Sequence, residues 1–90
     1  MAIGKEEARR FAEELYKKYY VEDMGCAVLN TFDFAREVTE LEGKFSTYRI
    51  REWRKALELW GYLVKISDRT IAIRLPEKEE GEEEPPKPVV

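Results

Sequence analysis

The segment from Ser46 to Leu75 constrains the fold more than any other part of this 90-residue chain. Its first half, 46–60, has the apolar spacing of an amphipathic helix, with a stripe formed by Ile50, Trp53, Leu57 and Trp60. Gly61 then ends the helix, because glycine readily adopts the left-handed conformation common at helix ends. Two runs of strand-forming residues follow, at 62–66 and 70–75, with a polar turn between them. The pattern predicts a helix that leads directly into a β-hairpin.

Two more helices are predicted upstream of this segment. The first covers 5–22, with a buried stripe formed by Ala8, Phe11, Ala12, Leu15 and Tyr19. The second begins after a side-chain cap at Asn30 or Thr31 and stops at Gly43, with Phe34, Ala35, Val38 and Leu41 on its buried face. Between the two helices, 26–29 is a short apolar run that could supply a third strand. The expected fold class is therefore α+β, with three helices and a C-terminal hairpin.

The composition argues against an enzyme. The chain has no histidine, which is the commonest general base and metal ligand. Its single cysteine, Cys26, lies in an apolar run and is expected to be an inert core residue. The five glycines are too widely spaced for a phosphate-binding loop. We expect no catalytic residues, no metal site and no cofactor.

The same composition bears on the compartment and the source. There is no disulfide framework, no membrane-spanning apolar stretch and no hydrophobic segment of a signal peptide at residues 1–7, so we expect an intracellular, cytoplasmic protein. Glutamine is absent, Asn30 is the only asparagine, and charged residues make up 39% of the chain. Few amides with abundant Glu and Lys is typical of hyperthermophile proteins, which favours a thermophilic, archaeal source.

Charge is distributed in three blocks along the chain. Residues 1–43 carry six basic and ten acidic side chains, whereas residues 44–76 carry eight basic and three acidic ones, a local balance of +5. Residues 77–90 carry six Glu against two Lys and almost no apolar groups. We expect one domain at 1–76 and a disordered acidic, proline-rich tail at 77–90. A local positive block decides where a polyanion can dock, even though the net charge of the chain is −3.

The order of helix, short strand, helix, helix and hairpin resembles the winged helix-turn-helix family. The most specific stretch is YRIREWRKALELWGYL at 48–63, which is similar to the end of that family's recognition helix and its entry into the wing. The resemblance covers roughly 5–75. It implies sequence-specific binding of double-stranded DNA by a small transcription regulator, with the helix at 46–60 in the major groove and the hairpin at 62–75 on the backbone or in the minor groove.

The resemblance also implies which side chains contact DNA: Ser46, Thr47, Tyr48, Arg51, Arg54, Lys55, Lys65 and Arg69. Arg51 is the expected base reader, because its planar guanidinium matches two acceptors of guanine. Ser46 would bind phosphate, and Arg69 with Lys65 would contact phosphate or enter the minor groove. For Arg54, and for Arg49 nearby, a structural ion pair is an equally good interpretation.

The sequence allows alternatives for the oligomeric state and for the binding partner. One domain offers few phosphate contacts, so useful affinity is expected to need a homodimer or tandem sites. The first helix is the expected dimer surface, because Tyr16 and Tyr20 widen its apolar stripe. The alternative interpretation of those tyrosines is that they flank one core. The alternative function is a winged-helix protein–protein interaction module, which would use Leu59, Tyr48 or the acidic first helix and read no DNA.

Overall fold

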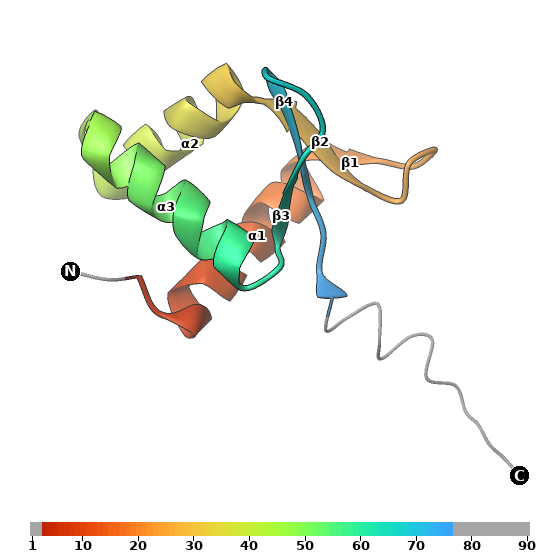
Figure 1. Cartoon of the computed structure of the whole chain (residues 1–90), viewed down its shortest axis with the longest axis horizontal. Coiled ribbons are helices and arrows are strands. Elements are labelled where there is room, and N and C mark those ends of the chain that lie inside the picture. Colours follow the sequence, from red (N-terminus) through yellow and green to blue (C-terminus); the bar gives the residue numbers. More distant parts are fainter. Residues whose placement is uncertain (1–2, 77–90) are drawn as a thin grey trace, which may run out of the picture.

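The computed structural model describes residues 3–76 and has an α+β fold of three helices and one four-stranded antiparallel sheet (Figure 1). The elements are α1 (Lys5–Tyr19), β1 (Tyr20–Val21), β2 (Cys26–Asn30), α2 (Thr31–Glu42), α3 (Thr47–Leu59), β3 (Leu63–Lys65) and β4 (Thr70–Ile73). The predicted class, with three helices and a C-terminal hairpin, is confirmed. The predicted acidic tail, 77–90, lies outside the described residues.

Short-range signals in the sequence set the ends of α2 and α3. The side chain of Asn30 accepts a hydrogen bond from the backbone N–H of Asp33 at 2.6 Å, and the hydroxyl of Ser46 accepts one from the backbone N–H of Arg49 at 3.2 Å. Such caps satisfy backbone donors that have no partner within the helix. Gly43, at φ 84°, ends α2 in the left-handed conformation. The predicted caps are therefore confirmed.

The end of α3 also determines how the hairpin begins. The N–H of Gly61 donates to the carbonyl of Glu58 at 3.1 Å, and the N–H of Tyr62 donates to that of Leu57 at 2.8 Å. This is the Schellman arrangement, and the φ of 82° at Gly61 suits glycine. The turn sends Tyr62 into the core, where its side chain is fully buried. The chain then continues into β3 without a linker.

The sheet joins the hairpin to the N-terminal half of the chain. Its strand order is β1-β2-β4-β3, so β4 lies between its hairpin partner and β2. Ala27 faces Ile73 and Leu29 faces Ile71 across β2 and β4, and all four side chains are buried. The helices pack against β2, β3 and β4 from the same core. Burial alternates along β2, where Ala27 and Leu29 are the buried residues, whereas three consecutive residues of the central strand β4 are buried.

The strand β1 was not predicted. Tyr20 and Val21 pair with Ala27 and Cys26, so α1 ends at Tyr19 rather than at Glu22. Gly25, at φ 68°, allows the turn between the two strands. Pairing with β2 satisfies the backbone groups of Tyr20 and Val21 as well as a longer helix would. The helical spacing of the sequence does not reveal that a strand competes with the helix for these residues.

Several side chains are less buried than the sequence predicted, and Tyr19, Ala35 and Ile50 are half-buried. Leu41 is 48% exposed, because its helix buries Glu37 instead, whose carboxylate binds Lys18 at 2.8 Å and Tyr19 at 2.6 Å. Trp60 is 39% exposed, since the Schellman turn gives its expected place in the core to Tyr62. Cys26, expected in the core, is only half-buried in β2 next to the sheet edge.

Candidate nucleic-acid interface

The helix α3 presents one exposed face that carries most of the predicted DNA contacts. Trp53 and Leu57 bury the opposite side, and Ile50 packs against the core beside them. At about 100° per residue, Arg51 and Lys55 lie roughly opposite this buried side. The exposed face consists of Thr47, Tyr48, Arg51, Lys55, Glu58 and Leu59. It is thus a mixed polar surface with two cations at its centre.

Two arginines near this face form ion pairs with acids, so they are less available to an external anion. Arg49 contacts the carboxylate of Glu42 at 2.9 Å, and the indole N–H of Trp53 donates to the same oxygen at 2.8 Å. The Arg49 hydrogen bond, followed by that of Trp53, lowers the pKa of Glu42 below its usual value. This network ties α2 to α3. Arg54 lies 3.5 Å from Glu58, one helical turn away.

Arg51 and Lys55 differ from these two arginines. Both are exposed, and neither forms an ion pair with any other residue in the described range 3–76. Such side chains can bind an external anion without first giving up an internal partner. Of the three predicted cations of α3, Arg51 and Lys55 are therefore available to an anion, whereas Arg54 is ion-paired with Glu58.

The N-terminal end of α3 holds the remaining helix candidates. Thr47 is exposed and the ring of Tyr48 is 61% exposed. The hydroxyl of Ser46 already accepts the N–H of Arg49 as the helix cap, which leaves its proton free to donate. These three residues can offer hydroxyl groups to a ligand beside the N-terminus of the helix.

The hairpin candidates lie at the tip of β3 and β4, beside the start of α2 (Figure 1). The carbonyl of Arg69 accepts the N–H of Thr31 at 2.9 Å, so the tip is attached to α2. The Arg69 side chain is exposed and has no ion pair among the described residues, whereas Lys65 lies 3.6 Å from Asp68. Of the two predicted cations of the hairpin, Arg69 is the more available to an anion.

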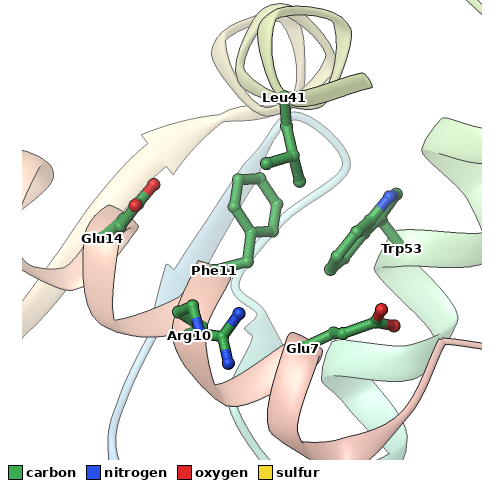
Figure 2. Close-up of a pocket in the computed structure, with 6 residues that line it drawn as sticks. All are labelled: Glu7, Arg10, Phe11, Glu14, Leu41 and Trp53. Carbon is green, nitrogen blue, oxygen red and sulfur yellow. The ribbon is translucent and has the colours of Figure 1, made fainter.

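A different side of the molecule is acidic. A cavity of about 210 Å³ lies among α1, α2 and α3. Figure 2 shows the side chains of Leu41, Phe11 and Trp53 facing one another there. Its rim carries Glu7, Glu14 and Arg10. An adjoining cavity of about 270 Å³ adds Lys18, Glu37 and Glu40. Together the two cavities carry four carboxylates against two cations, which repels a polyanion.

Two exposed aromatic residues are absent from the predicted contacts. Phe32 is 73% exposed at the start of α2, and Phe45 is 69% exposed in the turn before α3. Together with Ala35, Arg36 and Thr39 they line a groove of about 220 Å³, called here the Phe32–Phe45 groove. A signal for Phe32 existed, because Phe32 and Phe34 are two positions apart and a helix cannot bury both on one narrow stripe.

Comparisons of the chain with protein-family models, with curated proteins and with solved structures found no match. None of the helices within residues 3–76 is long and apolar enough to cross a membrane. The same residues contain no cluster of three or more His, Cys, Asp or Glu side chains that could hold a metal ion. The function is therefore inferred from the surface of residues 3–76.

Proposed function

We propose that this chain is a winged helix-turn-helix domain that binds double-stranded DNA with sequence preference, as a small transcription regulator. In this proposal α3 enters the major groove, and the hairpin of β3 and β4 is the wing that contacts the backbone or the minor groove.

The connectivity supports the winged-helix part of the proposal. The chain runs through a helix, a strand, two helices and a hairpin, and β4 pairs with both β2 and β3. The hairpin therefore forms one side of the sheet, and its tip is attached to the start of α2 through Arg69 and Thr31. The additional strand β1 lies at the far edge of the sheet from β3 and does not interrupt this arrangement.

The observation that carries the DNA-binding part is the pair Arg51 and Lys55. They share the centre of the exposed face of α3, and the described residues hold no acid in an ion pair with either. The acidic cavities are lined by α1 and by one side of α2 instead, with Trp53 from the buried side of α3. Local charge thus favours one docking side for a polyanion, and that side carries a helix of a size that fits the major groove.

Selection from a random duplex pool tests the proposal. Wild-type protein should enrich a defined site, and Arg51→Ala should relax the base preference at one position, because a bidentate contact discriminates by about 1–3 kcal/mol. Arg69→Ala should weaken all sequences alike, since it loses a backbone contact. Lys17→Ala is the control, because Lys17 is an exposed lysine of α1 with no ion pair in residues 3–76. If Arg51→Ala keeps the base preference of the wild-type protein, Arg51 is not the residue that reads the base.

A homodimer remains the expected way to reach useful affinity. Tyr16 is half-buried against the core, with its hydroxyl 3.5 Å from the carbonyl of Gly25. Tyr20, which lies in β1 rather than in α1, is 46% exposed and its ring centre is 5.2 Å from that of Tyr16. Tyr20 is therefore the better residue to test: Tyr20→Glu should shift a dimer to monomer in sedimentation and leave the circular dichroism spectrum unchanged.

The second candidate is a protein-interaction module without DNA reading. The observation that favours it is apolar exposure away from the core: Leu59 is 75% exposed on α3, and Leu41 opens onto the acidic cavity of Figure 2. Unpartnered apolar side chains at a concave site are typical of protein contacts. Failure to bind duplex DNA at low salt, with or without residues 77–90, would favour this function over the first.

A further inference from the structure

We propose that the Phe32–Phe45 groove binds an unpaired nucleobase, so that the domain prefers duplex DNA from which a single strand departs. The inference rests on the proposed function, because the duplex is bound by α3, but it names a separate site for the departing strand.

The first support is the shape and lining of the groove. Phe32 and Phe45, which are 73% and 69% exposed, line a groove of about 220 Å³, and its other uncharged lining residues, Ala35 and Thr39, are small or short. Sites for drug-sized ligands have volumes of roughly 300–1,000 Å³. A smaller apolar groove with aromatic rings suits one planar base, because every base has a face that stacks on an aromatic ring.

The second support is the absence of acids from the groove lining. No acidic residue lines the groove, and its charged lining residue is Arg36. The guanidinium of Arg36 is ion-paired with Asp33 at 3.1 Å and contacts the hydroxyl of Tyr19 at 3.2 Å, so it is held in position and is less available to an anion. The acids Glu37 and Glu40 of the same helix line the other cavity. The groove is thus distinguished by charge from the acidic cavities.

The third support is the location of two cations without ion pairs among residues 3–76. Lys44 directly precedes Phe45, and Arg69 is bonded through its carbonyl to Thr31, the neighbour of Phe32. Each aromatic residue therefore has a cation close to it along the chain or across a hydrogen bond. A strand that stacks a base on these rings would therefore meet a basic residue next to each of them, and basic residues beside stacking rings are the combination that single-strand binding sites use.

The groove also adjoins the proposed duplex site. Phe45 directly precedes Ser46, the cap of α3, and α2 lies beside α3 in the fold (Figure 1). A strand that leaves a duplex held at the N-terminal end of α3 can therefore reach Phe45 first and Phe32 after it. A fully paired duplex has no unstacked base to offer the groove.

The test compares two labelled probes by fluorescence anisotropy, a blunt duplex and the same duplex with a short single-stranded overhang. Wild-type protein should bind the overhang duplex about 5- to 150-fold more tightly, the range that corresponds to one stacked base. Phe45→Ala and Phe32→Ala should each reduce this ratio toward one and leave the affinity for the blunt duplex unchanged. Phe45→Tyr, which keeps the ring, should keep the ratio.

Met24→Ala is the matched control, because Met24 is an exposed apolar residue, 56% accessible, in the turn between β1 and β2. Equal affinity of wild-type protein for both probes would overturn the inference and leave the proposed function standing. Binding of the overhang duplex without any binding of the blunt one would overturn the proposed function alone. Binding of neither probe would overturn both, and self-association lost in Phe45→Ala would then assign the groove to a protein contact.

Discussion

Replacement of Lys55 by alanine should change how strongly salt weakens DNA binding. The reason lies in the ion pairs of the cations around α3 and the hairpin. Lys55 and Arg69 have no ion pair within residues 3–76, whereas Arg54 and Lys65 each lie beside an acid. A cation that is already neutralised releases little counterion from DNA when it binds. The proposed function therefore predicts two effective phosphate contacts for each domain, with Arg51 on a base.

The magnitude follows from counterion release. With two contacts the slope of log K against log salt is about −1.8, so affinity should fall ~12-fold between 50 and 200 mM salt. If the two ion-paired cations, Arg54 and Lys65, also released counterions, the slope would be about −3.6 and the loss ~150-fold. Lys55→Ala should reduce the slope to about −0.9 and the loss to ~3.5-fold. The three cases differ by amounts that a titration resolves.

The assay is a fluorescence anisotropy titration of one duplex site at several salt concentrations. Lys17→Ala serves as the control, because it removes the same charge from an exposed position on α1. The control should keep the wild-type slope, since Lys17 lies in the helix that carries the acidic rim. A slope that Lys17→Ala lowers as much as Lys55→Ala would mean that total charge, rather than the face of α3, governs binding.

Three further predictions concern the fold that holds this face. Gly61→Ala should destabilise the protein by about 1–2 kcal/mol in urea unfolding, because its φ of 82° is unfavourable for alanine, and Gly61→Asn should cost less. Leu57→Ala should cost about 2–5 kcal/mol, since Leu57 is fully buried, whereas the exposed Leu59→Ala should stay within about 0.5 kcal/mol; equal effects would contradict the assigned face of α3. The Arg49 hydrogen bond lowers the pKa of Glu42. The stability that the ionised Glu42 carboxylate contributes should therefore be complete above the ordinary pKa of 4.5 and be lost as the pH falls through the lower pKa of the folded state. Glu42→Gln should therefore flatten the loss of stability in acid, and an unchanged pH profile would refute this role.

The features of this fold that could be predicted from the sequence are those with short-range signals. The caps Asn30 and Ser46 and the helix stops Gly43 and Gly61 lie where the pattern places them. Each depends on a hydrogen bond or a backbone conformation within about one helical turn. Such features can be predicted because the residues that decide them are neighbours in the chain.

The prediction was wrong where two distant segments compete for the same residues. Tyr20 has the spacing of a helical residue, but it pairs with Ala27 in β1. Leu41 has the spacing of a core residue, but Glu37 takes the buried position because Lys18 and Tyr19 satisfy its carboxylate. A periodicity describes one helix and does not say which of its sides the neighbouring helices cover.

The sequence by itself determined three helices, a C-terminal hairpin and a basic block at 44–76, because periodicity, caps and charge are properties of short stretches of chain. Only the tertiary structure decided the strand order, the exposure of Phe32 and Phe45, and which cations face solvent without an acid. The physical reason is that ion pairs and burial depend on residues brought close by folding. Arg49 and Arg51 are two positions apart in the sequence, but Glu42 reaches only the first of them.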